Sequence, residues 1–153
     1  MDRPDVIIED SLTGIGSDRY GDYLAHALCL GGRCAFQFNG QNFELHENDL
    51  MIVRKDKLID DVRPSDDFAV RTLYVTAQFV ELCTPQTNYG MKGQLSLFLN
   101  PIMGLDDRQR FVCERDFRWI AYRLEQTGHK FYRELLINAV QSAILDFSIF
   151  IRR

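Results

Sequence analysis

Histidines, cysteines and paired acidic residues are the side chains of this sequence with the chemistry to bind a metal or to transfer protons. The three histidines, His26, His46 and His129, lie far apart, and no H-x-H or H-E-x-x-H spacing occurs. Metal sites need several such ligands at short, recurring spacings. The sequence therefore predicts no bound metal, and His26 in an apolar stretch is more typical of a hydrogen-bonded core residue than of a ligand.

The four cysteines also lack the paired C-x-x-C spacing of a zinc site. Two interpretations are open for Cys29 and Cys34, which flank the glycines at 31–32. If these glycines form a two-residue hairpin, the two thiols lie opposite each other on neighbouring strands and could form a redox switch. The favoured interpretation is that they are small buried hydrophobic residues, as free cysteines commonly are.

The acidic pairs at 60–61, 66–67 and 106–107 occur where strands end, turns form or a helix begins. Aspartate serves as a turn or cap residue at such places. Adjacent carboxylates on a strand point to opposite faces, which is poor geometry for acid–base catalysis. The sequence also has no G-x-S-x-G motif, phosphate-binding loop or dinucleotide fingerprint. We therefore expect no catalytic residue, no cofactor and no enzymatic activity.

The charge and hydropathy of the chain argue against two classes of partner, nucleic acids and membranes. The chain has 18 Lys and Arg against 22 Asp and Glu, a net charge of −4. Proteins bind duplex DNA through basic side chains that neutralise phosphates, so this chain is not expected to contact DNA itself. An apolar leader and an apolar run of membrane-spanning length are both absent from the sequence. We expect a cytoplasmic protein that does not enter a membrane.

A β-rich region at 21–78 follows an N-terminal arm at 1–20. Asn39 and Gly40 form the strongest hairpin signal in the chain. Short apolar runs separated by turn residues predict a sandwich or barrel. The expected strands are Tyr23–Leu30, Cys34–Phe38, Asn42–His46, Leu50–Val53, Leu58–Val62 and Phe68–Ala77.

Small barrels enclose ligand pockets that alternate strand residues line. Three polar side chains within the apolar strands are the candidate ligand-binding residues, namely His26, Arg71 and Tyr74. Arg71 is the strongest candidate because its planar guanidinium suits a carboxylate or a phosphate. The alternative for Arg71 is a salt bridge to one of the nearby aspartates.

Two helices are expected at 106–153, after a connecting loop with short helical turns at 79–105. Asp106 and Gln109 have the spacing of a capping box, which would begin the first helix. Gly128 is suited to end it. The last helix then runs to the end of the chain.

Apolar residues of the last helix form two rows, which together are wider than the stripe that one core contact requires. We expect one row to pack on the domain, made by Ile137, Val140, Ile144, Phe147 and Ile151. We expect the other row to form an exposed homodimer contact, made by Tyr132, Leu136, Ala139, Ala143 and Phe150. The alternative is a helix wedged into the core between the barrel and the preceding helix.

Several segments resemble, in order, the cupin-like sensor domains of AraC-type transcription regulators. They are Leu28–Gly32, Phe36–Leu45, Glu47–Val53, Ser65–Phe68 and Asn100–Leu105, with Asn48 where glycine is usual. The resemblance implies an α+β fold, in which a cupin-like double-stranded β-helix, or jelly-roll barrel, precedes a C-terminal helical hairpin. It also implies a small-molecule effector, a homodimer and a separate C-terminal domain with helix-turn-helix units. The clustered histidines of metal-binding cupins are absent from the sequence.

The leading hypothesis is a regulatory domain that senses an unidentified small molecule and dimerises, with DNA bound only through a C-terminal domain missing from this chain. Because residues 149–153 lie in an amphipathic helix without a cap, we expect the gene to continue into a basic helical domain. One alternative is a small stand-alone cupin enzyme, an isomerase or a metal-dependent oxygenase, which would require clustered metal ligands. Another is a purely structural dimerisation domain with a filled barrel.

Overall fold

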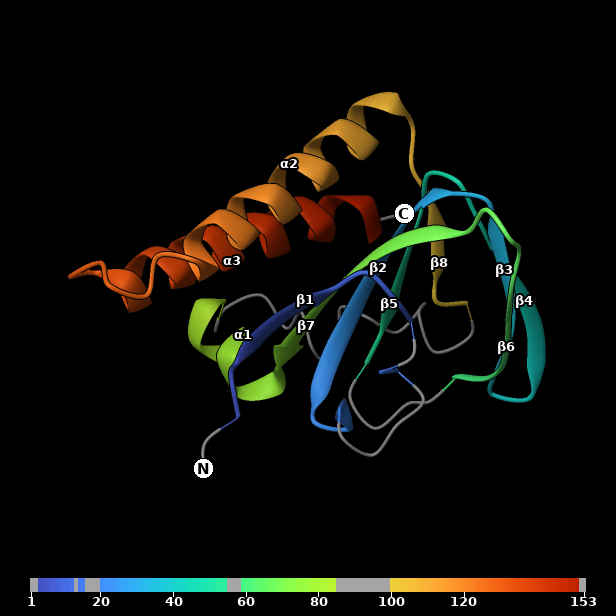
Figure 1. Ribbon diagram of the computed structural model, residues 1–153, viewed down its shortest axis with the longest axis horizontal. Coiled ribbons are helices and arrows are strands. Elements are labelled where there is room, and N and C mark those ends of the chain that lie inside the picture. The colour runs from blue at the N-terminus through green and yellow to red at the C-terminus, as the bar shows by residue number, and fades with distance from the viewer. Residues whose placement is uncertain (1–2, 13, 16–19, 55–58, 85–99, 152–153) are drawn as a thin grey trace.

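Two antiparallel β-sheets face each other and enclose the barrel interior (Figure 1). The computed structural model describes residues 3–12, 14–15, 20–54, 59–84 and 100–151. The first sheet has the strand order β1 (Val6–Glu9), β7 (Ala69–Thr76), β2 (Tyr23–Gly31), β5 (Asp49–Val53), β8 (Ile102–Gly104). The second sheet has the order β4 (Gln41–His46), β3 (Arg33–Phe38), β6 (Ile59–Pro64). The predicted α+β fold class, a cupin-like barrel followed by two helices, is confirmed.

Three helices complete the described fold, and the two long ones cover the outer face of the first sheet (Figure 1). They are α1 (Ala77–Cys83), α2 (Asp107–Leu124) and α3 (Tyr132–Ile151). The predicted capping box begins α2, because the Asp106 carboxylate accepts from Gln109 N and the Gln109 side chain accepts from Asp106 N. No helix in the described part of the chain has the length and apolarity that a membrane span requires.

Strand alternation divides the first sheet between two hydrophobic cores. On β2, Leu24 and Leu28 face the helices, whereas Ala25 and Ala27 face the second sheet. The helix-side core also takes Val140, Ile144 and Phe147 from α3. Each β2 and β7 residue therefore belongs either to the barrel interior or to the seam under the helices, and this decides which polar side chains can meet.

The two glycine turns differ from each other. Asn39 and Gly40 have φ angles of 54° and 77° and join β3 to β4, as the hairpin signal predicts. The hairpin considered at 31–32 is wrong, because β2 and β3 belong to different sheets and the chain crosses between them. Cys29 and Cys34 are therefore not paired across a hairpin, although both are buried, free thiols of the barrel core.

Two short strands lie in segments expected to be irregular. β1, in the expected N-terminal arm, pairs with β7, and β8, in the expected connecting loop, pairs with β5. Both are edge strands, so their position depends on backbone hydrogen bonds to a neighbour rather than on a local apolar pattern. Residues 85–99 of the expected connecting loop lie outside the described residues.

Candidate functional site

The three candidate ligand-binding residues do not converge on one cavity. Register places Leu73 of β7 opposite His26, and Tyr74 opposite Ala25. Because side chains alternate along a strand, Arg71 and His26 face the helices while Tyr74 faces the barrel interior. Two separate regions, the seam under the helices and the barrel interior, therefore carry the polar residues that the sequence singled out.

His26 is buried under α3 and has the character of a core residue. Its Nδ1 lies 3.1 Å from the carbonyl oxygen of Leu73, and its ring centroid lies 5.7 Å from that of Phe147. A carbonyl oxygen only accepts, so Nδ1 carries the proton and donates it. Burial lowers the pKa of His26 to about 4. The imidazole is therefore neutral at pH 7 and ties β2 to β7 beneath the helix.

Arg71 makes the salt bridge that was the alternative to ligand binding. Its Nε lies 3.3 Å from Oδ1 of Asp10, whose side chain is 76% exposed. The guanidinium also borders a crevice between the sheet and α2, next to Leu28 and Phe117. Arg71 is therefore held in place by a solvent-exposed partner and also lines the crevice.

Tyr74 belongs to an aromatic cluster in the barrel interior. Its ring stacks on Tyr20, with centroids 4.3 Å apart, and Tyr23 meets Tyr20 edge-on at 5.3 Å. The Tyr20 hydroxyl donates to the Glu9 carboxylate at 2.7 Å. Burial raises the pKa of Tyr74 far above its ordinary value, so its hydroxyl stays protonated at physiological pH.

Residues before β2 close this interior. Leu12 and Ile15 are buried in the same core as Tyr74. Gly14 lies so near the cluster that a Cβ would stand 2.3 Å from the Tyr20 ring and 2.6 Å from the Tyr74 hydroxyl. The glycine is therefore needed for this close approach. These residues were not among the predicted site residues, and the apolar side chains of Leu12 and Ile15 around Gly14 are the signal in the sequence that could have found them.

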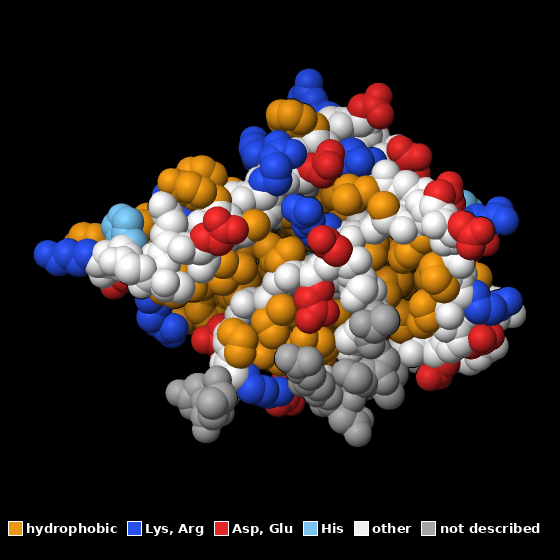
Figure 2. Space-filling view, in the orientation of Figure 1, with side chains coloured by type: hydrophobic (Ala, Val, Ile, Leu, Met, Phe, Trp, Pro, Cys, Tyr) orange, Lys and Arg blue, Asp and Glu red, His pale blue; other side chains and the backbone are white. Residues whose placement is uncertain are grey.

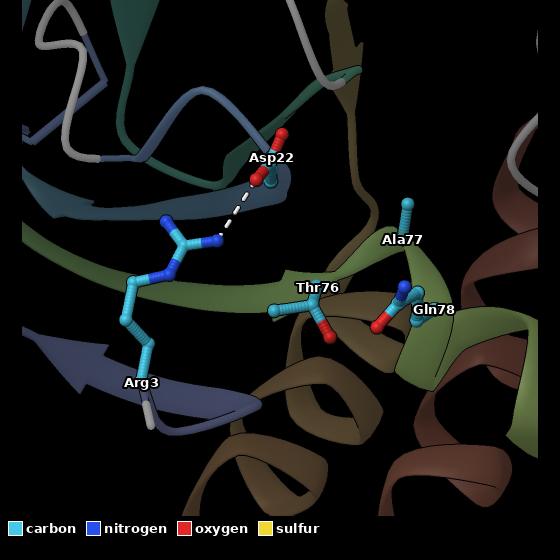
Figure 3. A pocket seen from close by; sticks show the side chains of 5 residues that line it. All are labelled: Arg3, Asp22, Thr76, Ala77 and Gln78. Atoms are coloured by element: carbon cyan, nitrogen blue, oxygen red, sulfur yellow. Dashed lines mark hydrogen bonds and ion pairs between the residues drawn. The ribbon is translucent and has the colours of Figure 1, made fainter. Parts of the chain in front are cut away.

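A surface depression of about 250 Å³ opens where β1, β2 and β7 meet α1 (Figure 3). Figure 3 shows Arg3 reaching across it to Asp22, with Thr76 and Gln78 on the opposite side. The Arg3 guanidinium donates to Asp22 at 2.8 Å, and both side chains are at least half exposed. The basic group is thus already neutralised, and the buried Thr76 hydroxyl is already engaged, because it donates to Asp5 and accepts from Phe79 N of α1.

The contact between α2 and α3 contains a buried acid pair. Asp116 is 5% exposed and lies against Asp146, while an Arg115 nitrogen lies 3.6 Å from Asp116 and 3.5 Å from Asp146. Burial and, after it, the neighbouring Asp146 carboxylate raise the pKa of Asp116 to about 8, and Arg115 opposes the shift. In the described residues no group of three or more His, Cys, Asp or Glu is placed to hold a metal ion. Because its pKa is raised to about 8, Asp116 is mostly protonated at pH 7, and the pair shares this proton.

The residues expected at the dimer contact are mostly inside the domain. Leu136, Ala139 and Ala143 are buried in the helix-side core, and Tyr132 and Phe150 are half-buried against it. The row does not form an exposed contact, because α3 packs on the sheet, on α1 and on α2 at once. A wide arc of α3, rather than a narrow stripe, is therefore buried within its own domain.

Comparison with known proteins identifies the fold family. The sequence model of the AraC-like ligand binding domain matches residues 22–107. The chain belongs to this family. The AraC-like domain has the fold of the AraC-like transcriptional activator CuxR, with 15% identity and a TM-score of 0.59 over 96% of this chain and 52% of that one. Apo ToxT from Vibrio cholerae matches with 10% identity and a TM-score of 0.57 over 92% of this chain and 55% of its own.

The AraC-like domain spans about half the length of these solved structures, covering 52% and 55% of them. No curated protein sequence matches it significantly. The family consists of ligand-binding domains of transcription regulators and is not an enzyme family.

The departure from the family pattern at Asn48 has a structural consequence. Asn48 has a φ of 76°, in the left-handed region that glycine adopts most readily and asparagine tolerates. Its side-chain oxygen accepts a hydrogen bond from Arg110 of α2. In this AraC-like domain the turn before β5 is therefore tied to α2 by a side chain that glycine could not supply.

Proposed function

We propose that this chain is the effector-sensing and dimerisation domain of a cytoplasmic AraC-type transcription regulator, and that it has no enzymatic activity. The match to the AraC-like ligand binding domain over residues 22–107 carries the proposal. The net charge of −4 supports DNA binding by a separate domain rather than by these residues.

We infer that the barrel interior is the effector site and that the residues before β2 regulate access to it. Leu12 and Ile15 fill part of the interior but belong to a segment outside the strands. The Tyr20–Tyr74 stack and the Tyr20–Glu9 hydrogen bond fix Tyr20 against the same interior. A ligand that takes the place of Leu12 and Ile15 would displace these two side chains from the interior and so change the surface of the domain.

The outer side of α3 carries a second apolar stripe, which we propose as the homodimer contact. Positions 131, 135, 138, 142, 145 and 149 follow alternating steps of four and three. Phe131, Leu145 and Ile149 are exposed by 51%, 46% and 63%. Such spacing is typical of the contact line between two paired helices.

The order of residues along this stripe favours a second copy of the same chain as the partner. The stripe is symmetric about position 140, with apolar residues at both ends and Asn138 and Ser142 near the centre. In an antiparallel pair of identical helices, Leu135 of one copy would meet Leu145 of the other, and the two polar residues would meet each other. A twofold contact requires this self-complementarity.

We expect Leu145→Glu to dissociate the dimer, because the substitution places a carboxylate against Leu135 of the second copy. Sedimentation velocity at about 20–50 µM should show a folded monomer, since a buried charge without a partner costs several kcal/mol. Leu82→Glu is the matched control, because Leu82 is an equally exposed leucine on α1. The double substitution Leu135→Lys and Leu145→Glu should restore the dimer by pairing opposite charges.

A wild-type chain that is monomeric at these concentrations would contradict the dimer proposal. Dissociation by Leu82→Glu but not by Leu145→Glu would place the contact elsewhere. Leu136→Glu would not test it, because Leu136 is buried in the core and the charge would unfold the domain.

A further inference from the structure

The crevice beside Arg71 lies at the seam between the first sheet and α2. Leu28 of β2 is directly opposite Arg71 of β7 in the sheet register, so the two side chains stand next to each other on the face that α2 covers. The crevice has a volume of about 70 Å³. It is lined by Leu28, Leu30, Arg71, Glu114, Phe117 and Arg118. Leu28 and Phe117 are buried and form its apolar floor, whereas the charged side chains are exposed or partly exposed and form its rim.

The charged side chains at the rim favour a ligand that carries a single negative charge. Among the residues that the structure describes, Arg71 forms one ion pair, with Asp10 through Nε. Arg118 is exposed and makes no ion pair or hydrogen bond within the part of the chain that the structure describes. Glu114 lies 3.1 Å from Arg110, which offsets its charge. Figure 2 shows acidic and basic side chains next to one another along this side of the sheet and α2.

We propose that this crevice binds a small amphipathic monocarboxylate, with its carboxylate between Arg71 and Arg118 and its hydrocarbon part on Leu28 and Phe117. Guanidinium groups bind carboxylates through charge-assisted hydrogen bonds in a fixed fork geometry. The carboxylate would take the place of Asp10 at Arg71. Glu114 at the rim disfavours ligands with two negative charges, such as phosphate monoesters.

This site is separate from the barrel interior and does not depend on the effector site proposed above. Leu28 and Phe117 belong to the helix-side core, whereas the tyrosine cluster belongs to the barrel core. A ligand held by Arg71 of the sheet and Arg118 of α2 would strengthen the attachment of α2 to the barrel. It would thereby affect the helical region that carries the proposed dimer contact.

The test is a titration of the isotope-labelled chain with sodium hexanoate at constant ionic strength, followed by NMR. We expect saturable shifts of the Leu28 and Leu30 methyl groups and of the Arg71 side chain. Hexylamine, which has the same number of carbon atoms and the opposite charge, should not bind. Arg71→Gln and Arg118→Gln should each weaken binding about tenfold, the effect of losing about 1.4 kcal/mol.

Two further variants sharpen the test. Asp10→Asn should tighten hexanoate binding, because it removes the carboxylate that competes for Arg71. The gain should be only about two- to threefold, a change of under about 1 kcal/mol, because an exposed ion pair is weak. Arg108→Gln removes an exposed arginine of α2 that does not line the crevice, so it should leave binding unchanged.

The inference is overturned if hexanoate produces no saturable shifts, if hexylamine binds equally well, or if both arginine variants bind as the wild type does. Shifts of the Met51 methyl and the Tyr74 ring instead would place the acid in the barrel interior. That result would overturn this inference while supporting the proposed effector site.

Discussion

Gly32→Ala is expected to lower the free energy of unfolding far more than Gly40→Ala does, although both glycines have positive φ angles, of 68° and 77°. Left-handed backbone costs a residue with a Cβ about 1–2 kcal/mol in either position. At Gly32 the added Cβ would also stand 2.7 Å from the backbone of Asp67 and Phe68, whereas at Gly40 nothing lies within 4 Å. Relief of such a clash adds about 1–3 kcal/mol, for a total of about 2–5 kcal/mol.

Urea unfolding of the two variants and the wild type measures this difference. The difference between the two variants isolates the cost of the clash, because the cost of the left-handed backbone is common to both sites. Equal losses of stability at the two positions would show that the crossing at 31–33 does not lie against the chain before β7.

Asp116→Asn is expected to stabilise the domain at pH 8 by about 1–3 kcal/mol, because it removes a buried carboxyl whose ionisation folding opposes. The pKa of Asp116 is raised to about 8 in the fold, above its ordinary value. For an acid shifted in this direction, stability is greatest below the unfolded pKa, about 4, and is lost as pH rises through the folded pKa. Asparagine stays neutral and can donate to Asp146, so the variant should lack this loss.

Thermal unfolding of the variant and the wild type between pH 6.5 and 8 isolates this effect, because the four buried cysteines, whose pKa values are also raised, cost stability only as pH approaches their ordinary pKa of about 9. The folded-state pKa of His26 is lowered to about 4, so its contribution is lost only as pH falls below about 6.5. Asp66→Asn, which removes an exposed carboxylate in the turn before β7, is the control and should follow the wild-type curve. A wild-type melting temperature that is constant over this range would contradict the account of the acid pair.

Local patterns in the sequence were sufficient to predict the features that depend on neighbouring residues. Asn39 and Gly40 predicted the β3–β4 hairpin because both residues tolerate positive φ. Asp106 and Gln109 predicted the start of α2 because a capping box is complete within four residues. Both are determined by short-range backbone chemistry, and the structure confirms both.

The features that the sequence did not predict depend on packing between residues far apart in the chain. Glycines at 31–32 are compatible with a hairpin, but the pairing of β2 with β5 and β7 sends the chain to the other sheet. The described residues of both apolar rows expected on α3 lie in or against the helix-side core, because α3 packs on α1 and α2 as well as on the sheet, and the exposed stripe is a third set of positions. The opposite orientations of Arg71 and Tyr74 follow from strand alternation, since residues three apart on a strand face opposite ways.

Dimerisation of this chain as a regulatory domain can be measured inside the cell by the repression of a reporter gene with a fusion protein. The chain would be joined to a DNA-binding domain that represses only as a dimer. The wild-type fusion should repress the reporter about tenfold or more, the Leu145→Glu fusion should not, and the Leu135→Lys and Leu145→Glu double variant should repress again. Repression by the wild-type fusion no stronger than by the DNA-binding domain alone would contradict dimerisation.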